Sequence, residues 1–210
     1  MHTETVFLRA IDGAELETDV VRTDAPHPRA VVIVAHPHPL HGGNRHDRVV
    51  AAIQRAALAE GCHSISPDFR GVGNSSGTHD NGDAERLDLA AACELATMIE
   101  PDCPIVMAGY SFGALVALNV THPDIAAWLA VAPPLAMAGG DPLAATNHRP
   151  KILVAAEHDQ FTDAAAMTGL TRDWTRTSVR VALGVDHFLV VDTDAIVGTA
   201  LVGTLADIGV

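Results

Sequence analysis

Short apolar runs alternate with longer segments of helical spacing along most of the chain. The runs that predict strands are residues 30–35, 62–66, 105–108, 125–132, 152–155 and 179–183, and the first of them reads as a strand buried on both faces. The segments whose apolar residues recur every three or four positions predict helices at 47–61, 83–99, 113–120, 162–175 and 193–208. This alternation predicts an α/β fold built on a mostly parallel sheet.

The first part of the chain departs from that alternation. Segments 6–10 and 15–22 flank the dipeptide Asp12-Gly13, which is typical of a tight turn. We therefore predict an antiparallel hairpin at the start of the sheet. No repeat, low-complexity tract or linker divides the sequence, and its length suits one core, so we predict a single domain over residues 1–210.

Helical spacing also predicts which side chains of the segment 83–99 are buried. The expected core positions are Leu87, Leu89, Ala91, Leu95 and Met98.

Composition narrows the classes of function. Hydrophobic residues make up 48% of the chain and charged residues 19%, which is typical of a folded globular protein. The formal net charge is -13, from 26 acidic and 13 basic residues. Phosphate backbones and anionic lipids both need a basic surface, so we expect no nucleic-acid partner and no membrane partner.

Cysteine usage and the first residues suggest a compartment. Cys62, Cys93 and Cys103 are odd in number and show no C-x-x-C spacing, so neither a disulfide framework nor a structural zinc site is predicted. The N-terminus lacks the basic and apolar regions of a signal peptide, and no apolar stretch approaches the ~20 residues of a membrane span. We expect a cytoplasmic protein.

The pentapeptide 109–113, G-Y-S-F-G, is the most informative motif. It follows the apolar run 105–108 and precedes the helical segment 113–120, so it lies at a strand-to-helix turn. Small residues on both sides permit a sharp, strained turn that lifts the central side chain above the sheet edge. This pattern predicts that Ser111 is a nucleophile.

A serine nucleophile needs a base, and the base needs an orienting acid. Both follow later strands: Asp159 comes after 152–155 and His187 after 179–183, in the chain order expected for this kind of turn. Because parallel strands end at one edge of a sheet, these side chains can meet Ser111. Three other acids compete with Asp159 for the orienting role: Glu157, Asp163 and Asp186.

The developing oxyanion needs backbone N–H donors. One is expected from Phe112, which follows the nucleophile. The other is expected from the loop 36–43, H-P-H-P-L-H-G-G, after the strand 30–35. Proline has no N–H, so His38 is the leading donor and Leu40 the second.

Two further patterns admit competing readings. His36, His38, His41 and His46 are spaced closely enough to suggest metal ligands. No H-E-x-x-H motif or ligating carboxylate accompanies them, so we predict no metal and interpret His36 as a buried loop residue. The segment 70–77, R-G-V-G-N-S-S-G, lacks the lysine of a phosphate-binding loop and is interpreted as a tight turn.

Together these motifs resemble the α/β-hydrolase superfamily over nearly the whole chain. The loop 36–43, the D-F-R-G-V-G-N-S string at 68–75 and the turn 109–113 carry the resemblance, with 157–161 and 186–188. The first three are similar to those of small, cap-less bacterial hydrolases related to dienelactone hydrolases, which themselves carry Cys at the position of Ser111. The resemblance implies a three-layer fold without a lid domain, because only residues 133–150 fill the usual place of a lid. It also implies an open site for small soluble substrates. We predict no cofactor.

The sequence thus predicts a serine esterase that forms an acyl-enzyme, with a small-molecule ester as its partner; a homodimer is left open. A peptidase or an acyltransferase could use the same residues, because the pocket selects the leaving group. A catalytically silent binding protein with this fold is the alternative from another class.

Overall fold

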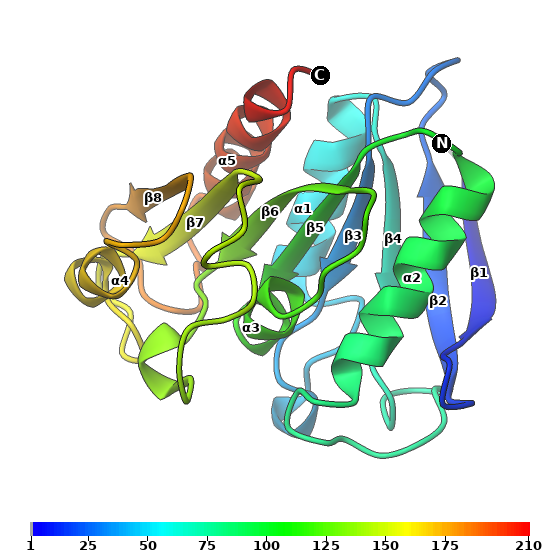
Figure 1. The fold of residues 1–210 in the computed structure, drawn as a ribbon, viewed down its shortest axis with the longest axis horizontal. Helices are drawn as coiled ribbons and strands as arrows, with labels where there is room; N and C mark the ends of the chain where they lie inside the picture. Colours follow the sequence, from blue (N-terminus) through cyan, green and yellow to red (C-terminus); the bar gives the residue numbers. More distant parts are fainter. Residues whose placement is uncertain (1) are drawn as a thin grey trace.

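One eight-stranded sheet runs through the molecule in a computed structural model that describes residues 2–210 (Figure 1). Its strand order is β1-β2-β4-β3-β5-β6-β7-β8. The strands are β1 (His2–Arg9), β2 (Glu15–Arg22), β3 (Val31–Ala35), β4 (His63–Pro67), β5 (Ile105–Tyr110), β6 (Ile125–Val131), β7 (Lys151–Ala156) and β8 (Thr177–Ala182). The pairs β1–β2 and β2–β4 are antiparallel and all pairs from β4 to β8 are parallel.

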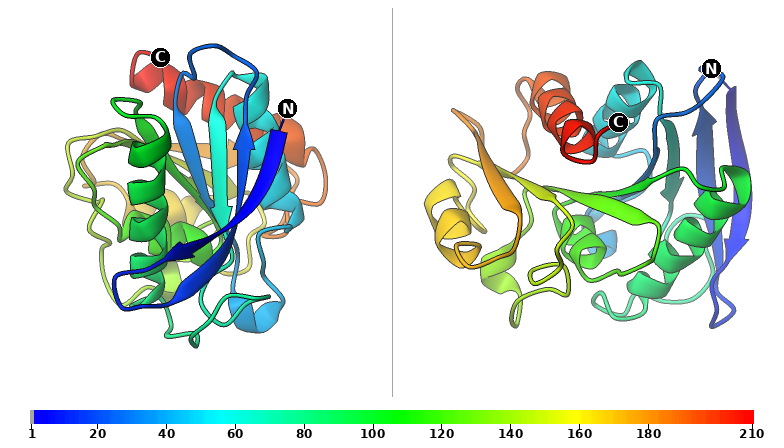
Figure 2. Two further views of the ribbon diagram at one scale, coloured as in Figure 1. Left: turned by 90° about the vertical axis from the view of Figure 1, so that its right-hand side faces the viewer. Right: turned by 45° about the horizontal axis from the view of Figure 1, so that its top comes forward.

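Five α-helices cover the two faces of this sheet, as Figure 2 shows in its right-hand view. They are α1 (Arg48–Ala59), α2 (Glu85–Ile99), α3 (Phe112–Leu118), α4 (Ala164–Leu170) and α5 (Thr193–Asp207). One core cluster joins the sheet to α1 and α5, and the other joins it to α2, α3 and α4. This three-layer architecture with an antiparallel hairpin confirms the fold class that the sequence predicted.

The central strands are apolar on both faces because helices cover both. All five residues of β3 and all six of β5 are buried. Parallel strands direct their carboxyl ends to the same edge of the sheet, so the loops after β3, β5, β7 and β8 gather there. The loop after β3 contains a short 3-10 helix, η1 (Pro39–His41), and the loop after β6 contains another, η2 (Leu135–Met137). Residues 132–150 hold no larger insertion, in keeping with the predicted absence of a lid.

The predicted buried face of α2 is partly wrong. Met98 is 78% exposed, whereas Glu85 and Asp88 are completely buried. Asp88 pairs with Arg70, and Glu85 accepts hydrogen bonds from the N–H groups of Asp80 and Gly82. Satisfied carboxylates therefore occupy positions that hydrophobicity alone assigns to solvent.

The helix predicted at 162–175 is also shorter than expected. The structure has α4 only over Ala164–Leu170, after which the chain passes through turns to Trp174. Helical spacing in the sequence did not reveal this early end.

Candidate active site

Ser111 lies at the turn between β5 and α3, where its backbone adopts φ 54° and ψ -120°. A non-glycine residue rarely adopts a positive φ, so the surrounding structure must hold it there. A Cβ atom on Gly109 would lie 2.5 Å from Gly113 O, and one on Gly113 would lie 2.4 Å from His36 O. Both glycines are therefore required by close backbone packing around Ser111.

The structure brings Ser111, His187 and Asp159 into one hydrogen-bonded row. Ser111 Oγ lies 2.8 Å from His187 Nε2, and His187 Nδ1 lies 2.7 Å from Asp159 Oδ2. The side chains of His187 and Asp159 are 5% and 1% exposed. These residues come from the loops after β5, β8 and β7, as the sequence predicted from their positions at strand ends.

The hydrogen-bond partners of Asp159 determine which atoms of this row carry protons. Asp159 Oδ1 accepts from the N–H groups of Phe161 and Thr162, at 2.8 and 3.2 Å. An ionised carboxylate has no proton to donate, so His187 Nδ1 must carry the proton that it shares with Asp159. In the neutral ring Nε2 then has a free lone pair that can accept the Ser111 hydroxyl proton.

The three competing acids are engaged elsewhere. Glu157 accepts from Gly184 N–H at 2.8 Å, and Asp163 caps α4 by accepting from Ala166 N–H at 2.8 Å. Asp186 accepts from Phe188 N–H at 3.1 Å. Of the candidate acids, Asp159 is therefore the one that the structure places on the His187 ring.

The loop after β3 brings His38 beside Phe112, with their ring centroids 4.8 Å apart. Within residues 2–210, no protein acceptor takes a hydrogen bond from the N–H of either residue. Leu40 N–H, the other expected donor, is already engaged by His38 Nδ1 at 3.2 Å. Burial, aided by His79 and His41, lowers the pKa of His38, so its ring accepts this bond as a neutral imidazole.

His36 is completely buried and controls the orientation of this loop, a role that the sequence did not reveal. Its Nε2 accepts from Phe69 N–H at 3.0 Å, so Nδ1 carries the ring proton and donates to Pro37 O at 2.7 Å. Burial lowers the pKa of His36 to about 4, which keeps the ring neutral. In a trans peptide the C=O and N–H point in opposite directions, so holding Pro37 O inward turns His38 N–H outward.

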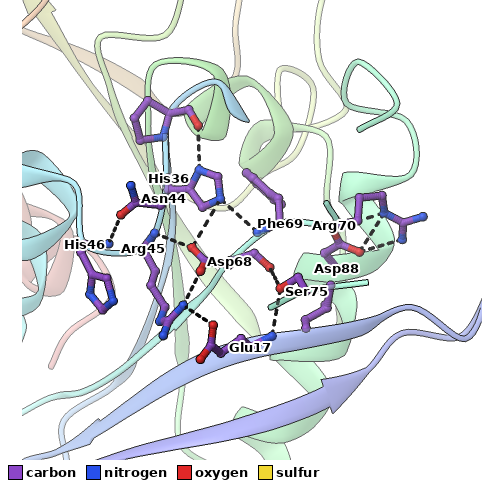
Figure 3. A network of polar contacts seen from close by, with 12 residues as sticks. Glu17, His36, Asn44, Arg45, His46, Asp68, Phe69, Arg70, Ser75 and Asp88 are labelled. Atoms are coloured by element: carbon purple, nitrogen blue, oxygen red, sulfur yellow. Dashed lines mark hydrogen bonds and ion pairs between the residues drawn. The ribbon is translucent and has the colours of Figure 1, made fainter. Parts of the chain in front are cut away.

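A polar network anchors the same loop from the other side (Figure 3). Asp68 accepts from Arg45 N–H at 2.7 Å and from the Arg45 guanidinium, which also contacts Glu17 at 3.0 Å. Ser75 Oγ donates to Asp68 O and accepts from Glu17 N–H, both at 2.9 Å. The turn 68–75 thus ties the loop after β3 to β2.

Arg70, in the same turn, also forms ion pairs within the fold. Its guanidinium contacts Asp88 at 2.6 Å and Asp12 at 2.7 Å. Burial alone would lower the pKa of Arg70, but the hydrogen bonds to these carboxylates outweigh it and raise the pKa. The guanidinium is therefore not free for a phosphate, in agreement with the interpretation of 70–77 as a tight turn.

A cavity of about 230 Å³ opens beside Ser111. Its lining combines apolar groups of Phe112, Leu115, Pro134, Met137 and Phe161 with polar groups of His38, His41 and Asn81. Met137 is 69% exposed and Phe161 40%, so the cavity is open to solvent at its rim. Such a site suits a small, mostly apolar group next to the serine hydroxyl.

Two kinds of feature are absent from residues 2–210. No group of three or more His, Cys, Asp or Glu side chains among them is arranged to hold a metal ion. None of the helices in that range is long and apolar enough to cross a membrane.

Comparison with known proteins places this geometry in context. Residues 32–201 match the model of the alpha/beta hydrolase family. An uncharacterized protein of Rickettsia prowazekii, RP471, is 36% identical over 115 residues, which cover 53% of this chain and 48% of the relative. The match therefore spans about half the length of that curated relative.

Solved structures match over nearly the whole chain. An alpha-beta serine hydrolase homologue from Coxiella burnetii has a TM-score of 0.88 at 26% identity and covers 97% of this chain and 98% of its own. A serine hydrolase without a lid from Xanthomonas campestris has a TM-score of 0.85 at 24% identity, with coverage of 97% and 94%. The similarity to the Xanthomonas campestris structure supports the fold alone.

Proposed function

This chain belongs to the alpha/beta hydrolase family, and from that premise we propose that it is a serine hydrolase that cleaves small carboxylic esters through an acyl-enzyme. The observation that carries the proposal is the buried row in which Ser111 Oγ lies 2.8 Å from His187 Nε2 and His187 Nδ1 lies 2.7 Å from Asp159. A serine hydroxyl is a weak nucleophile, and a base in contact with it is what activates it.

In the proposed reaction Ser111 Oγ attacks the ester carbonyl while His187 Nε2 takes its proton. The electron pair of the carbonyl bond moves to oxygen, and this oxyanion accepts hydrogen bonds from the N–H groups of Phe112 and His38. The intermediate collapses when the bond to the alcohol breaks and His187 donates its proton to the leaving oxygen. Asp159 stabilises the imidazolium that forms between these steps.

Water then repeats the sequence in the deacylation step. His187 removes a proton from water as the water oxygen attacks the acyl carbon. The bond from this carbon to Ser111 Oγ then breaks, His187 returns the proton to Oγ, and the carboxylic acid leaves. Small esters are favoured as substrates because the cavity beside Ser111 is about 230 Å³ and is lined largely by apolar groups.

The test is a series of p-nitrophenyl esters from acetate to laurate, assayed with the wild-type protein and the Ser111→Ala variant. We expect a burst of p-nitrophenol that depends on Ser111 and declines with acyl length, because long chains exceed the cavity. Ser111→Ala should lower kcat by roughly 10⁴-fold or more.

Other outcomes separate the alternatives. Undiminished turnover by Ser111→Ala would refute the proposal. Labelling of Ser111 by a fluorophosphonate without any ester turnover would shift the assignment to a peptidase or acyltransferase. Failure of that labelling would favour a silent binding protein.

A further inference from the structure

The loop between β8 and α5 carries His187, and side chains from distant elements hold three of its consecutive carbonyls. Tyr110 donates its hydroxyl proton to His187 O at 3.1 Å. Arg48 donates from Nη2 to Phe188 O and from Nη1 to Leu189 O, the latter at 2.7 Å. Backbone carbonyls in such a loop have no partner strand, so these bonds determine its path.

The two donors, Tyr110 and Arg48, lie at the end of β5 and at the start of α1. Tyr110 is the last residue of β5 and immediately precedes Ser111, so one dipeptide contacts both the ring and the backbone of His187. Its side chain is buried, and its ring stacks on that of His187 with the planes 30° apart and the centroids 5.7 Å apart. Arg48 begins α1 and also contacts Thr193 Oγ1 at the start of α5.

The loop needs such support because its backbone is strained. Leu189 has φ 47° and Asp192 has φ 55°, both in the left-handed region that non-glycine side chains disfavour. Residues held in such conformations persist only while their surroundings over-determine them. Asp186 gives local support, since its carbonyl accepts from Leu189 N–H at 3.1 Å.

We propose that Tyr110 and Arg48 are positioning residues that hold the backbone of His187 so that Nε2 stays within hydrogen-bond distance of Ser111 Oγ. This inference rests on the proposed function of His187 as the base. Reacting groups must be held to a fraction of an ångström for a proton to transfer, and a displacement of about 1 Å can cost on the order of 100-fold in rate. Loss of either donor should therefore slow chemistry rather than weaken substrate binding.

The chain offers a matched control for Arg48. Arg55 lies two turns later on α1 and also reaches the start of α5, where it contacts Asp194 at 2.6 Å. Its side chain is 57% exposed, and it donates to no carbonyl of residues 187–189. Removing Arg55 therefore takes away a contact between α1 and α5 without touching the backbone of His187.

The experiment compares Arg48→Met, Arg48→Lys, Tyr110→Phe and Arg55→Met with the wild-type protein on a short-chain p-nitrophenyl ester. For Arg48→Met and Tyr110→Phe we expect kcat to decline roughly 10-fold while KM stays unchanged, because only the chemical step is affected. Arg48→Lys should recover part of the loss, because an ammonium group can also donate to carbonyls. Arg55→Met should keep the kcat of the wild type.

A second readout does not depend on activity. The proton on His187 Nδ1 that is shared with Asp159 should give a downfield proton NMR signal in the wild type. Faster exchange of this proton with water is expected in Arg48→Met and Tyr110→Phe but not in Arg55→Met. Thermal midpoints of all variants reveal any that fail to fold.

The outcomes separate the two proposals. A kcat for Arg48→Met and Tyr110→Phe within twofold of the wild type, with an unchanged His187 signal, would overturn the positioning role while leaving the hydrolase intact. Equal losses in Arg48→Met and Arg55→Met would also overturn it. Absence of any Ser111-dependent turnover in the wild type would refute the proposed function alone, and the His187 signal would still decide whether the two residues hold the ring.

Discussion

Replacing Asp159 with Asn changes few atoms but should reverse the proton arrangement of the row. Asp159 Oδ1 accepts from the N–H groups of Phe161 and Thr162, so only the carbonyl oxygen of Asn can occupy that place. The Asn NH₂ group must then face His187 Nδ1 across the 2.7 Å that now separates Nδ1 from Asp159 Oδ2. Two N–H groups cannot face each other, so the ring proton moves to Nε2, and Nε2 can no longer accept from Ser111.

The expected cost is large because the base is then in the wrong tautomer. We expect kcat to decline by about 10⁴-fold, which corresponds to about 5 kcal/mol of transition-state stabilisation. The free energy of unfolding should change by less than about 1 kcal/mol, since both backbone bonds survive. The assay is steady-state hydrolysis of a short p-nitrophenyl ester, with urea denaturation of the same samples.

Asp163→Asn is the matched control for this variant. Asp163 is a nearby acid that caps α4, and Asn is an equally good cap, so activity and stability should both be retained. If Asp159→Asn kept more than about a tenth of the wild-type kcat, the tautomer argument would be refuted.

Two further predictions concern the surroundings of the row. Gly113→Ala should lower the free energy of unfolding by about 3 kcal/mol, because the new Cβ would lie 2.4 Å from His36 O. Gly198→Ala on α5, where nothing lies within 4 Å, should leave it equal or higher, and a similar loss in both variants by urea denaturation would contradict the reasoning. His36 should make stability depend on pH: its pKa is lowered from 6.5 to about 4, so the unfolded chain takes up a proton that the folded ring resists. The free energy of unfolding should therefore decline by about 3 kcal/mol as the pH falls from 6.5 to about 4, and it should not recover at lower pH. The same decline in a His36→Gln variant would contradict this prediction.

The sheet and the turn that carries Ser111 could be predicted because their signals are local. Continuous apolar runs mark strands covered on both faces, and the glycines around Ser111 mark a turn that tolerates no Cβ. Asp159 and His187 could be placed near Ser111 because each follows a strand of the same parallel sheet. The chain order Ser111, Asp159, His187 then supported the predicted roles of nucleophile, orienting acid and base, and the experiments above test these roles.

Other features depend on partners that sequence patterns do not display. Glu85 and Asp88 are buried because Arg70 and loop N–H groups satisfy their charges, so the buried face of α2 includes these two acids and excludes Met98. The contacts of Arg48 join residues 140 or more positions apart, so no local spacing reveals them.

The order of strands along the chain has a consequence for the newly synthesised protein. Ser111 precedes His187 by 76 residues, so at about 5–20 residues per second Ser111 leaves the ribosome roughly 4 to 15 s before His187 does. During that interval the nascent chain carries a serine with no partner to activate it. Under the proposed function, Ser111 can therefore be activated only after β7 and β8 have joined the sheet and brought Asp159 and His187 to it.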